Sequence, residues 1–551
     1  MAKYSILEMC GIWGKLGTRA RTQGESAGEE EYVRKLEHRG PEYTSVVNVT
    51  PNVTLGFTRL AINGLTPAGH QPFNYEDACV VCNGEIYNYK ELAERWSMKL
   101  AEGTSDCAVI PQLAKHLTMT DLCRALDGVF AFILVKSDGV YVARDPYGVR
   151  PLYYGRDGGS GSGDGGTHYW SSELKGLPAD CAHIEPFPPG TWRHYSHDGE
   201  LLSECRYHTV PHVKMAALED RVTARAALRT SLLSAVQKRL LSDRPIGALL
   251  SGGVDSSLIA AIAARELAVH GKKLHTFTIG MPGSTDMVYA QKVADLIGSE
   301  HHNVIVSAQD FLDAIPRVIH DIESYDITSV RASVGNWLIG KYIKEKTDIK
   351  VVFNGDGSDE IGGGYIYFYA APSDEEFEAE SERLLHEIHL FDVLRSDRSM
   401  AAHGLEARTP FLDKNVVATW RAIATRHRRP VRGGQMEKSI LREAFEADNY
   451  LPSDVLWRKK EAFSDGVSAA NDSWYIRAAE NAKASGITLD FVQSVASAWH
   501  LPPRTEEAYV YRTMFEADYG ARAALVFPHM WMPRWIAGAT DPSARTLKDL
   551  Y

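Results

Sequence analysis

The sequence predicts an α/β protein built from two domains of different architecture, and three observations lead to this prediction. Short β-like runs with intervening helical patches extend from about residue 10 to 205, which is typical of an α+β layered domain. From about residue 220, helical segments alternate with apolar β runs, which indicates a doubly wound parallel sheet with a helical C-terminal part. All seven Cys precede residue 206, so the two parts also differ in composition. We therefore expect domains at residues 10–205 and 220–551.

The elements of the first part follow from β-branched and aromatic runs that end in turn residues. Strands are expected at residues 53–57, 79–82, 129–135 and 139–143, and helices at residues 90–99 and 106–116.

The second part has strands that are short and apolar, and helices with a longer apolar period. Strands are expected at residues 245–250, 273–279, 300–306 and 350–354, and helices at residues 258–265, 287–296, 332–346 and 375–394. The chain from about residue 366 is expected to be mostly helical.

Composition excludes several classes of protein. The formal net charge is 60 − 71 = −11 without a long basic run, which argues against a nucleic-acid partner. No stretch approaches the roughly 20 apolar residues that span a bilayer, and the N-terminus lacks the apolar core of a secretion signal. An odd number of Cys suits free thiols in a reducing compartment, so the sequence predicts a cytoplasmic protein.

The most specific local sequence is Ser251-Gly252-Gly253-Val254-Asp255-Ser256-Ser257, between an expected strand and an expected helix. Free backbone N–H groups and the positive end of the helix dipole meet there, which makes an anion site. The two glycines allow close approach of a ligand, and the three hydroxyls add donors. Asp255 would repel a bare phosphate, and its presence indicates Mg²⁺ held against one. No Lys follows, so this is not the loop of ordinary nucleotide hydrolases; a purely structural Gly/Ser loop is the alternative.

This loop resembles the pyrophosphate loop of ATP pyrophosphatases, which cleave ATP between the α and β phosphates and adenylate a substrate. The N-terminal part carries a second resemblance, to the class II glutamine amidotransferase domain, which has an N-terminal-nucleophile (Ntn hydrolase) fold. Its motifs occur in the order Cys10-Gly11-Ile12-Trp13-Gly14, Arg59-Leu60-Ala61-Ile62-Asn63, Asn83-Gly84-Glu85-Ile86-Tyr87-Asn88, Thr104-Ser105-Asp106, Asp127-Gly128-Val129-Phe130-Ala131 and Arg144-Asp145-Pro146-Tyr147-Gly148-Val149-Arg150. Without this series, Cys10 would be an ordinary thiol.

The second resemblance implies a glutamine-hydrolysing site. Cys10 would be the nucleophile, activated by its own α-amino group. Arg59 would bind the glutamine carboxylate, and Glu85 and Asp106 its ammonium group. The Asn83 amide and the Gly84 N–H would stabilise the oxyanion. The glutamine pocket as a whole comprises Arg59, Leu60, Ala61, Ile62, Asn63, Asn83, Gly84, Glu85 and Asp106.

A free α-amino group on Cys10 requires that the nine residues before it be absent. We therefore expect a mature chain that begins at Cys10, either through translation from Met9 with removal of that Met or through processing of a nine-residue leader.

Both parts together resemble glutamine-hydrolysing asparagine synthetase, over the chain to about residue 520. The carrying segments in the second half are residues 274–284, 323–333, 355–360, 404–413, 436–438, 458–466 and 507–512. The resemblance implies an ATP site formed by Leu249, Ser251, Gly252, Gly253, Asp255, Ser256, Ser257, Ile279, Asn354 and Gly355. Asn354 stands where the family usually has Ser.

The same resemblance implies roles for charged residues around the ATP site. Asp255 and Asp359 would hold Mg²⁺, and Lys460, with Lys438 beside it, would neutralise phosphate charge. Asp356 would be catalytic but stands where the family usually has Glu, so its carboxylate reaches less far. Thr328, Arg331 and Arg408 are candidates for binding aspartate, with a buried ion pair to Glu406 as the alternative role of Arg408.

The implied reaction hydrolyses glutamine, channels the ammonia, and amidates aspartate through β-aspartyl-AMP, with ATP converted to AMP and pyrophosphate. The resemblance is also compatible with a homodimer, although the sequence identifies no interface. Two alternatives stay open. One is a related amidotransferase that adenylates another carboxylate, and the other is a catalytically silent regulator that binds glutamine or nucleotide.

Overall fold

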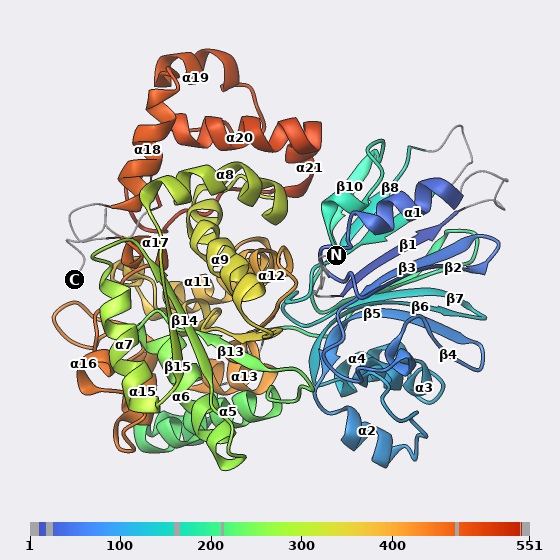
Figure 1. Cartoon of the computed structure of the whole chain (residues 1–551), viewed down its shortest axis with the longest axis horizontal. Coiled ribbons are helices and arrows are strands. Elements are labelled where there is room, and N and C mark those ends of the chain that lie inside the picture. Colours follow the sequence, from blue (N-terminus) through green and yellow to red (C-terminus); the bar gives the residue numbers. More distant parts are fainter. Residues whose placement is uncertain are drawn as a thin grey trace. The chain divides into compact units, whose positions relative to one another are not determined.

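The computed structural model describes residues 10–17, 26–158, 166–210, 214–468, 473–539 and 541–542 of the chain (Figure 1). The described chain divides into two compact units. Unit 1 comprises the described residues of Met1–Thr209, with Leu241–Pro245 and Met400–Glu406, and unit 2 comprises Val210–Leu240, Ile246–Ser399 and the described residues of Ala407–Tyr551. None of the described helices is both long enough and apolar enough to cross a membrane.

Unit 1 contains two six-stranded sheets whose described strand pairs are antiparallel. The first has the order β10-β8-β9-β1-β3-β2 and the second the order β12-β11-β7-β6-β5-β4. The strands are β1 (Gly11–Leu16), β2 (Tyr43–Thr50), β3 (Val53–Arg59), β4 (Phe73–Tyr75), β5 (Ala78–Ile86), β6 (Gly128–Lys136), β7 (Gly139–Arg144), β8 (Tyr153–Arg156), β9 (His168–Ser171), β10 (His183–Pro186), β11 (Thr191–Tyr195) and β12 (Leu201–Arg206).

Alternation along the central strands of unit 1 creates two cores, because successive side chains of a strand point to opposite faces. Val81 of β5 and Ile133 of β6 pack in one core with Leu55 of the first sheet. Their neighbours Val80 and Phe132 pack in a second core with the helices. These helices are α2 (Tyr89–Arg95), α3 (Val109–Leu113) and α4 (Met119–Ala125), while α1 (Ser26–Arg34) contacts β2 and β3. The layered α+β architecture predicted for this part is confirmed.

Unit 2 is built on a five-stranded sheet of order β15-β14-β13-β16-β17. Its strands are β13 (Ile246–Leu249), β14 (His275–Gly280), β15 (Glu300–Ile305), β16 (Val351–Phe353) and β17 (Glu406–Arg408). β13 pairs in parallel with both β14 and β16, and β14 pairs in parallel with β15. The strand order reverses at β13, and ligands of doubly wound folds bind at such a reversal, beyond the carboxyl ends of the strands.

The helices of unit 2 include the long connections of the sheet and a helical C-terminal part, as predicted. They are α5 (Arg221–Lys238), α6 (Val254–Val269), α7 (Thr285–Ile297), α8 (Ala308–Ile322), α9 (Ile327–Lys346), α10 (Ser358–Gly362), α11 (Asp374–Glu387), α12 (Asp392–Ala401), α13 (Lys414–Ala422), α14 (Thr425–Arg428), α15 (Ser439–Glu446), α16 (Ser453–Leu456), α17 (Phe463–Gly466), α18 (Trp474–Ala484), α19 (Leu489–Ala496), α20 (Glu506–Tyr519) and α21 (Ala523–Val526).

Two predicted helices differ from those observed. The segment predicted as one helix at residues 375–394 is interrupted, because a 3₁₀ turn at Ile388–Leu390 separates α11 from α12. The segment predicted as a helix at residues 106–116 begins as a 3₁₀ turn at Asp106–Ala108, where the Ser105 hydroxyl accepts from the Cys107 N–H. This turn directs the Asp106 carboxylate towards the N–H of Ile86 on β5.

Candidate functional site

Cys10 lies next to Arg59 because of the register between β1 and β3. Gly11 of β1 pairs with Thr58 of β3, so the residue before Gly11 lies beside the residue after Thr58. The Cys10 thiol donates to the carbonyl oxygen of Leu60 at 3.5 Å. Burial raises the pKa of this thiol to about 12, against the lowering effect of the Arg59 charge. A base is therefore needed to form the thiolate, which is the nucleophilic species.

The Arg59 guanidinium is fixed by the loop that follows β3. Its Nη1 donates to the carbonyl oxygen of Thr66 at 2.9 Å, and its Nη2 donates to that of Gly64. A Cβ atom at Gly69 would lie 2.1 Å from Nη2, so a side chain at this position would displace the guanidinium. The predicted pocket residues Leu60, Ala61, Ile62 and Asn63, which belong to this loop, are all buried.

β5 and the turn at Asp106 supply the remaining predicted residues of this site. Glu85 accepts from Asn63 Nδ2 at 2.5 Å, and its negative charge helps to raise the pKa of the Cys10 thiol. Asp106 accepts from the N–H of Ile86 at 2.5 Å, and burial raises the pKa of its carboxyl group. These two buried acids suit a ligand with a positive charge.

Asn83 on β5 carries a buried hydrogen-bond donor without a partner among the described residues. Its side chain is 2% exposed, and its Nδ2 has no hydrogen-bond partner among the described residues. Leaving a buried donor unpaired costs about 1–3 kcal/mol. Gly84 follows in the strand, and a Cβ atom there would lie 2.3 Å from the carbonyl oxygen of Val129.

Sequence reasoning did not place Glu406 at this site. Glu406 forms an ion pair with Arg150 at 2.7 Å, and its charge raises the pKa values of both Cys10 and Asp106. It belongs to the short segment Met400–Glu406, which is far from the rest of unit 1 in the sequence. No local pattern signals such a contribution.

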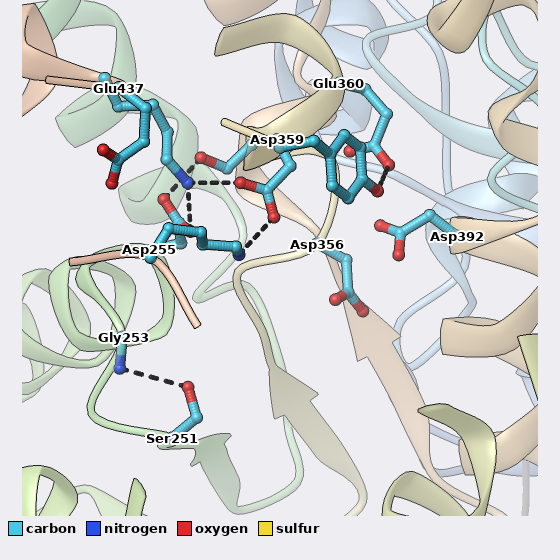
Figure 2. A network of polar contacts seen from close by, with 12 residues as sticks. Ser251, Gly253, Asp255, Asp356, Asp359, Glu360, Asp392 and Glu437 are labelled. Carbon is cyan, nitrogen blue, oxygen red and sulfur yellow. Dashed lines mark hydrogen bonds and ion pairs between the residues drawn. The ribbon is translucent and has the colours of Figure 1, made fainter. Parts of the chain in front are cut away.

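In unit 2 a pocket opens at the carboxyl ends of β13 and β16, where the strand order reverses. The Gly-rich loop, residues 251–257, forms one wall of the pocket. Gly252 has a positive φ of 72°, and a Cβ atom there would lie 2.5 Å from the Cβ of Tyr289. The Ser251 hydroxyl accepts from the N–H of Gly253, the N-cap of α6, at 3.3 Å (Figure 2).

The loop after β16 lies against the start of α6. A Cβ atom at Gly355 would lie 2.6 Å from the backbone nitrogen of Ser256, so this approach requires glycine. Of the residues predicted to bind ATP, those that line the pocket are Leu249, Ser251, Gly253, Asp255, Ser256, Ile279, Asn354 and Gly355. Ser257 is fully buried in α6, and its hydroxyl has no partner among the described residues.

Two predicted metal ligands converge on one cation position (Figure 2). Lys438 Nζ lies 2.6 Å from Asp255 Oδ2 and 2.6 Å from Asp359 Oδ1. Lys460 Nζ lies 2.5 Å from Asp359 Oδ2, and the Ser358 hydroxyl donates to Asp255 Oδ1 at 2.6 Å. Burial favours protonation of Asp359, but the two lysines outweigh it and hold the pKa of this carboxyl group well below its usual range.

Asp356 lies next to this position, in a second cluster of carboxylates (Figure 2). It accepts from Asn354 Nδ2 at 2.7 Å and from Arg395 at 3.0 Å, and Arg395 also binds Asp392. Glu360 accepts from the Tyr365 hydroxyl at 2.5 Å. Burial raises the pKa values of Asp356 and Glu360, which favours their protonated forms.

The three residues predicted to bind aspartate do not gather in this pocket. Thr328 lines it, and its buried hydroxyl has no partner among the described residues. Arg331 instead binds Glu507 with two contacts of 2.9 and 2.6 Å. Arg408 donates to the carbonyl oxygen of Arg239. Neither Arg331 nor Arg408 is among the described residues that line the pocket.

Sequence reasoning missed several charged residues that line this pocket, among them Asp392, Arg395 and Asp286. Asp286, in the first turn of α7, binds Arg458 at 2.9 Å, and Arg458 also binds Glu461 at 2.9 Å. Burial raises the pKa of Asp286 to about 7, although Arg458 acts in the opposite direction. The sequence around it carries no charge pattern that would have marked it.

Comparisons with known proteins match the two parts of the chain to two different families. The family model described as asparagine synthase matches residues 227–381 and 370–532, and the model described as glutamine amidotransferase domain matches residues 9–218. The asparagine synthetase [glutamine-hydrolyzing] of Gallus gallus is 41% identical over 98% of this chain and 99% of its own length. Those of Cricetulus griseus and Homo sapiens are 41% and 40% identical, each over 98% of both chains. This chain therefore belongs to the glutamine-hydrolysing asparagine synthetase family.

Proposed function

We propose that this protein is a ligase that makes asparagine from aspartate, ATP and glutamine. The observation that carries this proposal is the convergence of Asp255 and Asp359 on one cation beside the Gly-rich loop, in a chain that also holds the Cys10 site. The names of the relatives support the same reaction. Glutamine would be hydrolysed to glutamate and ammonia, and ammonia would displace AMP from β-aspartyl-AMP.

In the glutamine site, the Cys10 thiol attacks the amide carbon and the Asn83 Nδ2 donor faces the oxyanion. Arg59 binds the carboxylate of glutamine, and Glu85 and Asp106 bind its ammonium group. The base is the α-amino group of Cys10 in a chain that begins there. Met1–Met9 lie outside the described residues, so this start stays a prediction.

In the ATP site, Asp255 and Asp359 would hold Mg²⁺ on the pyrophosphate portion of ATP. The donor set fits, because two carboxylates already contact one cation at 2.6 Å. Bound Mg²⁺ supplies neutralisation of phosphate charge. Lys460 and Lys438 add positive charge, the loop N–H groups bind phosphate oxygens, and Leu249, Ile279, Asn354 and Gly355 enclose the adenosine.

Asp356 is proposed to act on the aspartate carboxylate or on the later proton transfer, since it lines the pocket beside the cation position. Thr328 is the residue best placed to contact aspartate, because its hydroxyl lacks a partner among the described residues. We further propose that residues 10–205 and 220–551 are the functional domains.

Product analysis tests this proposal. The protein is incubated with ATP, Mg²⁺ and glutamine together with a panel of carboxylic acids. Aspartate-dependent release of AMP and pyrophosphate, with equimolar asparagine, is expected. Release with a different carboxylic acid would identify the related amidotransferase instead, and the absence of pyrophosphate with every acid would indicate a silent regulator.

A further inference from the structure

Two histidines and a glutamate share one face of the sheet in unit 2, at the amino ends of β14 and β15. These strands are parallel neighbours (Figure 1), with His275 opposite Glu300 and Phe277 opposite His302. Residues two apart on a strand share a face, so His275, Glu300 and His302 lie together. The Gly-rich loop lies beyond the opposite ends of these strands, so this cluster is separate from the ATP pocket.

The distances among the three ligand atoms match three corners of a tetrahedron. His275 Nδ1 lies 3.3 Å from His302 Nε2, and Glu300 Oε1 lies 3.5 Å from the first and 3.8 Å from the second. A tetrahedral zinc site with bonds of about 2.1 Å has edges of about 3.4 Å, whereas octahedral edges are about 3.0 Å. All three atoms lie within 4.8 Å of one another.

His302 is held in the orientation that coordination requires. Its ring stacks on that of Phe277, with centroids 4.6 Å apart and planes 16° apart, and Tyr342 of α9 meets it edge-on. A hydrogen bond joins the two imidazoles, and one Glu300 oxygen approaches both rings, so three potential ligand atoms converge.

We propose that His275, Glu300 and His302 form a Zn²⁺ site with a fourth, solvent-facing position. Imidazole and carboxylate ligands favour Zn²⁺ over Mg²⁺, which prefers oxygen ligands in octahedral geometry. The Glu300 side chain is 56% exposed, so an ion can reach the site from solvent. The ion would join the amino ends of β14 and β15 and would take no part in the reaction at their other ends.

Co²⁺ titration in the presence of excess Mg²⁺ tests this site, because four-coordinate Co²⁺ absorbs visible light far more strongly than six-coordinate Co²⁺. The wild type is expected to bind one more equivalent of Co²⁺ than the His275→Ala/His302→Ala variant, with strong absorption that Zn²⁺ abolishes. His270→Ala removes an exposed histidine that lies outside the cluster and should behave as wild type. Counting by difference removes the contribution of cysteine thiols elsewhere.

Glu300→Gln provides a second measurement at a position whose side chain is 56% exposed, and circular dichroism checks that the variant folds as wild type does. It should weaken Zn²⁺ binding at least about tenfold, since even outer partners of metal ligands are worth that much. Zn²⁺ should also slow amide hydrogen exchange in β15 of wild type only. Equal Co²⁺ stoichiometry and spectra in wild type and the double variant, or only weak six-coordinate bands, would overturn the proposal.

Discussion

The roles of two residues with buried hydrogen-bond donors that are unpaired within the described residues, Asn83 and Thr328, can be tested directly. Asn83 Nδ2 and Thr328 Oγ1 both lack partners among the described residues, one in each candidate site. Burying such a group without an acceptor is costly, so each of these two donors is placed to bind a ligand that accepts from it. The same reasoning does not apply to Asp255 and Asp359, whose charges are already neutralised by lysines.

Asn83→Ala is predicted to lower the kcat of glutamine hydrolysis by about 10²–10³-fold, because removal of one oxyanion donor has that effect in acyl-transfer enzymes. Synthesis supported by free ammonia should be unchanged. The two rates are measured on the same preparation, with Asn74→Ala, an exposed position of β4, as the control. Equal loss of both rates would mean that Asn83 is needed only for folding.

Asp255→Asn is predicted to abolish synthesis, by at least about two orders of magnitude, while glutamine hydrolysis continues. The substitution removes one of two carboxylates that converge on the cation position, and metal stabilisation is worth several kcal/mol. Pyrophosphate release and glutamate formation are assayed in parallel. A folded variant that loses both activities together would contradict the assignment of two separate sites.

At the scale of elements, the prediction missed some for reasons that can be named. β17 is three residues long, too short to show alternation. The buried apolar residues of α8 follow a helical period, but the helix contains Pro316, which normally argues against a helix interior. α8 was nevertheless detectable, because Ser307 and Asp310 form a capping box whose spacing is visible in the sequence. The break between α11 and α12 carries no Gly or Pro signal.

Gly355→Ala is predicted to destabilise the protein by about 1–3 kcal/mol and to weaken ATP binding. The new methyl group would lie 2.6 Å from the backbone nitrogen of Ser256, and a backbone atom cannot move aside as a side-chain end can. Gly434→Ala is the matched control, because its Cβ atom would meet nothing closer than 3.6 Å. Denaturant unfolding and ATP titration give the two quantities, and equal behaviour of the two variants would refute the close approach.

At the scale of the whole molecule, the sequence predicted residues for both candidate sites but could not show how distant segments combine. Lys438 contacts Asp255 across 183 positions of sequence and Asp359 across 79. The segment Met400–Glu406 joins unit 1 although the residues on either side of it, Ser399 and Ala407, belong to unit 2. The order of motifs in the sequence identifies residues like Lys438 and Glu406 only through a family resemblance. Arg331 is a second example, because it pairs with Glu507 in the C-terminal helices and is not among the described residues that line the pocket.

The buried Asp286 predicts a pH dependence of stability. Its pKa is about 7 in the folded protein and about 4 in an unfolded chain, so the folded state holds the proton more tightly. This contribution to the free energy of unfolding is fully present below about pH 4 and is lost as pH rises through about 7. Relative to wild type, Asp286→Asn should therefore gain stability over that range.

Denaturant unfolding at several pH values checks this expectation, with Asp295→Asn, an exposed position of the same helix α7, as the control for loss of a charge. The shift corresponds to at most about 4 kcal/mol, since each pKa unit is worth about 1.4 kcal/mol. A stability difference between Asp286→Asn and wild type that does not change with pH would show that Asp286 stays ionised when buried.

The ammonium group of Lys438 gives the ATP site an internal counter-ion. Two carboxylates that face each other without a cation would repel, and the fully buried Lys438 prevents this repulsion. Binding of a metal–nucleotide complex at this point is consequently an ion exchange, in which the incoming divalent cation takes over the carboxylates and the released ammonium turns to the phosphates. Free Mg²⁺ brings no anion to accept the displaced ammonium, so the site should hold the metal only together with ATP.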